Sequence, residues 1–161
     1  MPKVLFVCMG NICRSPTAEG IFKKFVKELS PDINFYVDSA GTIGYHTGEL
    51  PDPRMRKHAS ARGYELESRA RQFDPKKDFE GFDYIITMDN DNYSDISKLD
   101  HKKYFSNKIL KMANFISDKK FKEVPDPYYG GAQGFELVID LLEDGSKNLL
   151  TKIREDFASS D

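Results

Sequence analysis

Two residues near the N-terminus have side chains that can attack and hold a phosphoryl group. Cys8 and Arg14 are separated by five residues within the segment VCMGNICRSP at positions 7–16. A cysteine thiolate is a strong nucleophile, and the planar guanidinium of arginine binds two phosphoryl oxygens at once while it stays charged. Five intervening residues allow the loop to curl around a tetrahedral oxyanion. The spacing alone is a weak signal, and it is the surrounding sequence that makes Cys8 a candidate nucleophile for phosphoryl transfer.

The elements on either side of this loop are suited to position it. The apolar run at 4–7 predicts a parallel strand that is buried on both faces. Ser15 is a favoured N-cap residue and Pro16 suits the first position of a helix, so a helix is predicted to begin here. Backbone N–H groups at a helix N-terminus form an anion site, and they favour the thiolate form of Cys8.

Two loop residues are of types that accept unusual backbone conformations. Gly10 and Asn11 tolerate positive φ, which a loop with converging N–H groups needs. The alternative interpretation of Cys8 is a small buried hydrophobe at the end of a strand, as most free cysteines are. The combination of strand, glycine-containing loop and Arg14 favours the anion site.

Asp126 is a candidate general acid because of its position between two prolines. The following proline biases it towards an extended conformation, although an isolated aspartate in such a place is more typical of a turn. A phenolate that leaves phosphorus needs a proton source opposite the nucleophile. The same carboxylate can then accept a proton from the water that hydrolyses cysteinyl phosphate.

The segment at 7–16 resembles the signature of the low-molecular-weight protein tyrosine phosphatases. The segments VDSAG at 37–41, FDYIITMD at 82–89 and DPYYG at 126–130 are similar to that family in the same order, so the resemblance covers nearly the whole chain. It implies a nucleophile, a phosphate clamp and a general acid and base at Cys8, Arg14 and Asp126. It also implies a supporting role for Ser39, which lies on another strand. The phosphate-binding loop that it implies consists of Met9, Gly10, Asn11, Ile12, Cys13 and Ser15.

Three tyrosines are candidates for the walls of a substrate slot. Tyr128 and Tyr129 are each as compatible with a structural role as with a functional one, but the family uses the first of them to line the slot. Tyr45 stands where relatives carry an aromatic residue, often Trp. Two flat walls admit a phenyl ring and exclude the shorter phosphoserine. Substrate preference stays open because of the Tyr-for-Trp difference and the adjacent His46.

Cys13 and Asp89 each have two interpretations. Cys13 is either a buried spacer or a second thiol that closes a reversible disulfide when peroxide oxidises Cys8, and the resemblance favours the second. Asp89 is either an ion-pair partner of Arg14 or an ordinary helix N-cap, which is commoner for an isolated aspartate.

Composition narrows the class of protein. With 161 residues, 39% of them hydrophobic, the chain is long enough for one core and is expected to form a single domain over 1–161. A net charge of −2 shows no broad basic field, so no nucleic-acid partner is expected.

The cysteine content and the apolar runs indicate where the protein is located. Two cysteines in a chain of this length indicate a reducing compartment. The apolar runs are too short for a signal peptide or a membrane span, so we expect a cytoplasmic protein without membrane insertion. Neither a metal nor a cofactor is indicated, because the cysteines and scattered histidines make no recognisable ligand set.

Strands alternate with helices along the chain. Helices are predicted at about 16–29, 53–62 and from 89, with a last helix from 135 that breaks near Gly145, and strands at 4–7, 34–38, 84–87 and 108–112. This order predicts an α/β fold: a single-domain parallel sheet of about four strands flanked by helices on both faces, with the phosphate-binding loop after a central first strand. A basic cluster is interpreted as a solvated face, part of which can attract acidic residues beside a phosphotyrosine; its members are Arg54, Arg56, Lys57, Arg62, Arg69 and Arg71.

We therefore expect a metal-independent protein tyrosine phosphatase that works through a cysteinyl-phosphate intermediate. Its partners are expected to be phosphotyrosine-containing proteins or peptides, its product inorganic phosphate, and its state a monomer or weak self-associate. An arsenate reductase of the same fold is one alternative, although it needs thiols beyond Cys13. A non-catalytic phosphotyrosine-binding or redox-sensing module is another, although simple capture has no use for Asp126.

Overall fold

The computed structural model describes residues 1–160, and for Tyr129 it describes the backbone alone. Four parallel strands form one sheet in the order β2-β1-β3-β4. They are β1 (Lys3–Cys8), β2 (Tyr36–Gly41), β3 (Tyr84–Thr87) and β4 (Ile109–Lys111). Because β1 pairs with a strand on each side, the predicted central position of the first strand is confirmed.

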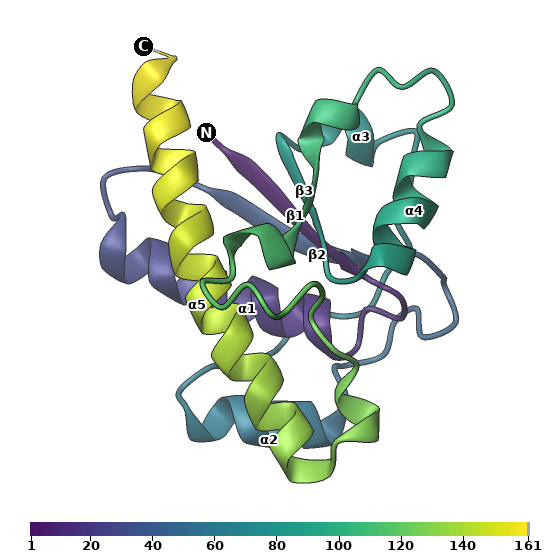
Figure 1. The fold of residues 1–161 in the computed structure, drawn as a ribbon, viewed down its shortest axis with the longest axis vertical. Helices are drawn as coiled ribbons and strands as arrows, with labels where there is room; N and C mark the ends of the chain where they lie inside the picture. Colours follow the sequence, from purple (N-terminus) through teal and green to yellow (C-terminus); the bar gives the residue numbers. More distant parts are fainter. Residues whose placement is uncertain (161) are drawn as a thin grey trace.

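Helices cover both faces of this sheet (Figure 1). Successive residues of a strand point to opposite faces, so β1 contributes to two cores. Val4 and Phe6 pack with α1 (Arg14–Leu29) and α5 (Gly131–Ser159), whereas Leu5 and Val7 pack with α3 (Asp78–Gly81) and α4 (Asn90–Leu99). The remaining helix, α2 (Pro53–Ala61), lies against α5. The predicted α/β fold is confirmed.

Short 3₁₀ turns occupy the connections of the C-terminal half. They are η1 (Ser106–Lys108), η2 (Met112–Phe115) and η3 (Pro127–Tyr129). The loop between η2 and η3 returns to the sheet, where the Val124 N–H donates to the Met88 carbonyl at 2.8 Å. This contact brings the segment that carries Asp126 to the edge of the sheet where β1 and β3 end. Among the described residues, no helix has both the length and the apolar character needed to cross a membrane.

The first helix begins at Arg14, two residues earlier than predicted. Its N-cap is Cys13 and not Ser15, because the Cys13 carbonyl accepts the first helical hydrogen bond from the Thr17 N–H at 3.3 Å. The fully buried Ser15 therefore lies inside the first turn. Its hydroxyl faces back into the loop instead of capping the helix.

The last helix runs without a break from Gly131 to Ser159, so the predicted interruption at Gly145 is wrong. A Cβ at Gly145 would lie 2.9 Å from the Met112 Sδ atom. The glycine allows α5 to pack closely against η2, and this packing offsets the lower helix propensity of glycine.

Candidate active site

The sulfur of Cys8 lies at the base of the loop that follows β1. Cys8 is only 3% exposed. The backbone N–H of Asn11 donates to its Sγ atom at 3.3 Å, and the Ser15 hydroxyl lies 3.0 Å from the same sulfur. Donors directed at sulfur stabilise a thiolate over a thiol.

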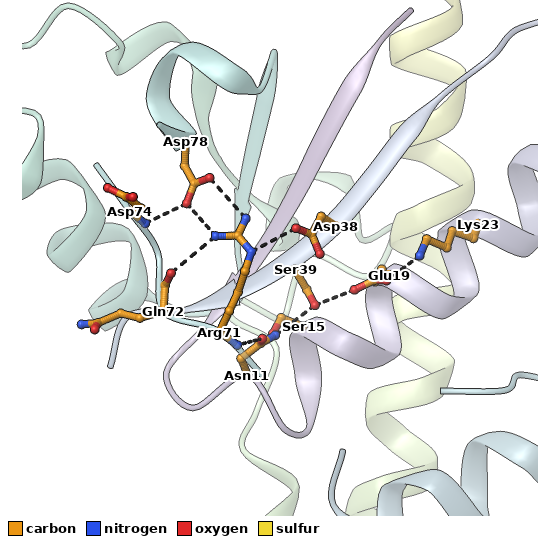
Figure 2. Close-up of polar contacts among 10 residues, drawn as sticks. All are labelled: Asn11, Ser15, Glu19, Lys23, Asp38, Ser39, Arg71, Gln72, Asp74 and Asp78. Atoms are coloured by element: carbon orange, nitrogen blue, oxygen red, sulfur yellow. Dashed lines mark hydrogen bonds and ion pairs between the residues drawn. The ribbon is translucent and has the colours of Figure 1, made fainter. Parts of the chain in front are cut away.

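Asn11 holds the curvature of this loop. Its φ of 58° lies in the left-handed region, which Asn accepts more readily than most residues. The Asn11 Nδ2 atom donates to Ser15 Oγ at 2.7 Å and to Ser39 Oγ at 3.0 Å. Because the Ser15 oxygen accepts from Asn11, its own proton is free to point to the Cys8 sulfur. Ser15 of the loop and the predicted supporting residue Ser39 on β2 thus meet at one buried amide (Figure 2).

Ser39 is in turn held by two charged residues of α1, Glu19 and Lys23. The Ser39 hydroxyl donates to Glu19 Oε1 at 2.6 Å, and Lys23 Nζ donates to Glu19 Oε2 at 2.6 Å, as Figure 2 shows. Glu19 is buried on α1, and the lysine offsets the cost of burying its charge. The hydroxyl of Ser39 is therefore oriented so that its lone pairs face Asn11.

Arg14 is held from the side opposite the loop. Its Nη1 atom donates to Asp89 Oδ2 at 2.7 Å and to the Val124 carbonyl at 3.1 Å. Burial acts to lower the pKa of Arg14, but the charges of Cys8 and Asp89 outweigh it and raise the pKa above its usual value. Arg14 is thus a permanent positive charge beside the sulfur.

Both interpretations of Asp89 hold in the structure. Its Oδ2 atom pairs with Arg14, while its Oδ1 atom accepts from the Asn92 N–H at 2.7 Å and caps α4. A capped helix N-terminus gives the carboxylate a fixed direction. The helix cap thereby fixes the direction of the ion pair.

The loop opens into a cavity of about 190 Å³. Asp126 reaches it from η3, where its Oδ1 atom accepts from the Tyr128 N–H at 3.0 Å. The structure thus brings the three predicted catalytic side chains to one cavity. The lining residues are Cys8, Met9, Gly10, Ile12, Cys13, Arg14, His46, Asp126 and Tyr128.

Tyr128 forms one wall and is locked in place by α2. Its hydroxyl donates to Asp52 Oδ2 at 3.1 Å, and the Arg54 guanidinium lies 4.8 Å from its ring centroid. Asp52 also caps α2, and its N–H donates to the Ile12 carbonyl at 2.8 Å. Burial, together with the charge of Asp52, raises the pKa of the Tyr128 hydroxyl, which therefore remains a donor.

The opposite wall differs from the prediction. Tyr45 is 82% exposed and does not line the cavity; His46 does, with its ring centroid 4.8 Å from that of Tyr45. His46 Nδ1 is 2.6 Å from Glu49 Oε2, a contact that fixes the imidazole. The side chain of Tyr129, the third predicted slot residue, lies outside the described part of the structure.

The two cysteines form no disulfide and have different surroundings. Burial, followed by the charges of Asp52 and Cys8, raises the pKa of Cys13 to about 12. Cys13 is therefore a neutral thiol near pH 7, whereas the Asn11 N–H and the Ser15 hydroxyl lie against the sulfur of Cys8. Within residues 1–160, no three His, Cys, Asp or Glu side chains are grouped so that they can hold a metal ion.

Sequence reasoning missed several residues that position this site. Asp52 and Glu19 also have partners close in the sequence, but the contacts by which they support the site, with Tyr128 and Ser39, join distant segments that no local pattern predicts. The sequence places Arg71 in a basic cluster typical of a solvated face, whereas in the structure it pairs with Asp38 and Asp78. The carboxylates that neutralise it stand 33 and 7 positions away, so the composition of its own segment gave no indication of them.

A Cys-x5-Arg anion loop at the carboxyl end of a central parallel strand, facing an aspartate across a small cavity, defines a cysteine-dependent phosphatase. Comparison with known proteins gives the family. The sequence profile described as low molecular weight phosphotyrosine protein phosphatase matches residues 3–159. The chain belongs to this family and is a protein tyrosine phosphatase, a hydrolase.

Individual relatives agree with this assignment. A putative low molecular weight protein-tyrosine-phosphatase of Synechocystis is 46% identical over 98% of this chain and 99% of its own, and the human low molecular weight phosphotyrosine protein phosphatase is 39% identical over 84% and 85%. The crystal structure of a protein tyrosine phosphatase from Entamoeba histolytica superposes with a TM-score of 0.91 at 47% identity, covering 97% of this chain and 99% of that one.

Proposed function

We propose that this phosphatase hydrolyses phosphotyrosine through a cysteinyl-phosphate intermediate on Cys8. The observation that carries the proposal is the convergence of Cys8, Arg14 and Asp126 on one cavity. The Cys8 thiolate attacks phosphorus while the bond to the phenolic oxygen breaks. Asp126 gives its proton to that oxygen, and Arg14 with the loop N–H groups binds the equatorial oxygens.

The second half-reaction reuses the same groups. Asp126, now a carboxylate, accepts a proton from a water molecule whose oxygen attacks the phosphorus of cysteinyl phosphate. The sulfur–phosphorus bond breaks, and the electron pair returns to Cys8 as a thiolate. The Ser15 hydroxyl, 3.0 Å from this sulfur, stabilises the returning charge. Inorganic phosphate is the product.

The depth of the sulfur supports an aryl substrate. Cys8 lies below the rim, where the flat ring of Tyr128 and the imidazole of His46 line the entrance. A phenyl ring can pass between such walls, and its length carries the phosphate to the sulfur. Phosphotyrosine in proteins or peptides is therefore the proposed substrate, with phosphoserine too short to reach.

We also propose that residues 1–161 act as one phosphatase domain in the cytoplasm, as a monomer or weak self-associate. The family match over 3–159 supports a single domain. A nucleophilic thiolate requires a reducing compartment, because oxidation removes it.

Oxidation of Cys8 is expected to be reversible because of Cys13. Peroxide converts the thiolate to a sulfenic acid and is itself reduced to water; the Cys13 thiol then displaces a second water and forms a disulfide. The charge of Cys8 helps to keep Cys13 protonated, and oxidation of Cys8 removes that charge. Loss of the thiolate thus makes Cys13 a better partner.

Mild peroxide should therefore inactivate the enzyme and dithiothreitol should restore it, with inorganic phosphate protecting. Cys13→Ser should recover a smaller fraction of its own starting activity, since its Cys8 oxidises further to sulfinic acid. Peptide mass mapping should find the Cys8–Cys13 link in the wild type. Equal recovery in both proteins and no link would contradict the proposal.

Replacement of Asp126 by alanine tests the general acid. Turnover should fall about 10²- to 10³-fold for aryl phosphates with strongly basic leaving groups, and far less for those with acidic ones. The plot of log rate against the acidity of the leaving phenol should steepen, measured by single-turnover phosphorylation.

Asp126→Asn is the matched control for loop structure. Its side-chain oxygen can still accept from the Tyr128 N–H, but its amide protons are not acidic enough to be transferred to a leaving phenolate. It should steepen the plot as Asp126→Ala does. Parallel plots for the wild type and both variants would show that another group is the acid.

A further inference from the structure

The guanidinium of Arg71 joins two elements beside the phosphate-binding loop. Its Nε atom donates to Asp38 Oδ2 at 3.0 Å on β2. Its Nη1 and Nη2 atoms donate to the two oxygens of Asp78 at 2.9 and 3.2 Å, at the start of α3 (Figure 2). Paired hydrogen bonds between arginine and a carboxylate fix both distance and direction.

The carboxylates of this clamp are themselves anchored. Asp78 is buried, and its Oδ2 atom also accepts from the Asp74 N–H at 2.7 Å. Asp38 precedes Ser39, whose hydroxyl accepts from Asn11. Burial acts to lower the pKa of Arg71, but hydrogen bonds to Asp78 and the charge of Asp38 outweigh it and raise the pKa, so the clamp stays charged.

The backbone of Arg71 contacts the loop directly. Its N–H donates to Asn11 Oδ1 at 3.0 Å, and its carbonyl accepts from the Gly41 N–H at 2.8 Å. Gly41 in turn lies against the loop, because a Cβ there would be 2.7 Å from the Met9 carbonyl oxygen. Arg71 thus stands between the end of β2 and the one loop residue with a left-handed backbone.

We propose that Arg71 is a positioning residue for the phosphate-binding loop. Its guanidinium, clamped by Asp38 and Asp78, fixes the backbone N–H that holds the side chain of Asn11. Asn11 then keeps its positive φ, and its own N–H stays directed at the Cys8 sulfur. The inference rests on the proposed role of Cys8 as nucleophile.

Arg71→Gln should loosen the loop without removing any group that contacts substrate. The inhibition constant of inorganic phosphate should rise about tenfold, which corresponds to the loss of about one hydrogen bond. Alkylation of Cys8 by iodoacetate at a fixed pH, followed by peptide mapping, should be slower, because the Asn11 N–H no longer stabilises the thiolate. Arg71→Lys keeps the positive charge but cannot form the paired hydrogen bonds. It should therefore restore neither phosphate inhibition nor Cys8 alkylation fully to the wild-type value.

Arg62→Gln is the matched control. Arg62 also bonds to carboxylates, on Glu136, Asp140 and Glu143, and its side chain is 26% exposed against 33% for Arg71. Its partners all lie on α5. Arg62→Gln should lower the melting temperature to a similar degree while it leaves phosphate inhibition and Cys8 alkylation as in the wild type.

A double-mutant cycle with Asn11 separates positioning from general stability. If Arg71 acts through Asn11, Arg71→Gln should change phosphate inhibition less than about twofold in an Asn11→Ala background. The inference would be overturned if the double variant raised the inhibition constant of phosphate by the product of the two single-variant factors. Equal effects of Arg71→Gln and Arg62→Gln on that constant would also overturn it. If instead the proposed function were wrong, the Cys8→Ser variant would retain turnover, and this result is distinct from any outcome of the Arg71 experiments.

Discussion

Replacing Cys8 with serine is expected to abolish turnover of an aryl phosphate, by about 10⁴-fold or more. Loss of a catalytic nucleophile has effects on this scale. A serine hydroxyl stays protonated at neutral pH, and the loop offers it no general base in place of the stabilised thiolate. The measurement is steady-state phosphate release, with single-turnover kinetics to exclude a slow product step.

The same variant should keep the binding site. Serine is nearly isosteric with cysteine, and the loop is held by Asn11, Ser15 and Ser39, which the change leaves in place. Isothermal titration should therefore show phosphate binding at least as tight as in the wild type, because a neutral hydroxyl does not repel the anion. Activity within tenfold of the wild type would refute Cys8 as the nucleophile.

Replacing Arg14 with lysine is expected to lower kcat about 10³-fold. An arginine that stabilises the transferring phosphoryl group contributes on this scale. A lysine ammonium is a point charge and cannot bind two equatorial oxygens in parallel. KM should rise less than kcat falls, since the paired contact is strongest in the transition state.

Asp89→Asn separates the clamp from its support. It retains an oxygen that can accept from the Asn92 N–H, but it weakens the ion pair with Arg14. Its loss of activity should be smaller than that of Arg14→Lys and should show no change in leaving-group dependence. An Arg14→Lys enzyme with near-normal kcat would show that another group holds the equatorial oxygens.

Local patterns in the sequence predicted the framework of the fold. The apolar run ending at Val7 gave the central strand, and the alternation of elements gave the parallel sheet. Ser15 misled because N-cap preference describes isolated helix ends, whereas here its hydroxyl is used by Asn11 and the Cys8 sulfur. Gly145 misled because close packing against Met112, not flexibility, explains it.

The site was predictable where it is contiguous in sequence and not where it is assembled from distant segments. The segment 8–15 carries its own signal of residue types and spacing. Arg71, Asp38 and Asp78 carry none, since their pairing exists only once β2 and the segment before α3 lie side by side. Tyr45 and His46 show the same limit, because adjacent residues point in different directions and the sequence does not say which one lines the cavity.

A covalent phosphoenzyme on Cys8 is the feature that separates this mechanism from direct attack by water. Wild-type enzyme mixed with an aryl phosphate that has a good leaving group, then acid-quenched within the first turnover, should carry one phosphoryl group on the peptide that contains Cys8. The adduct should appear as fast as the phenol and decay as fast as phosphate is released. Phenol release in a full burst with no phosphorylated Cys8 peptide, or with the phosphoryl group on another residue, would contradict it.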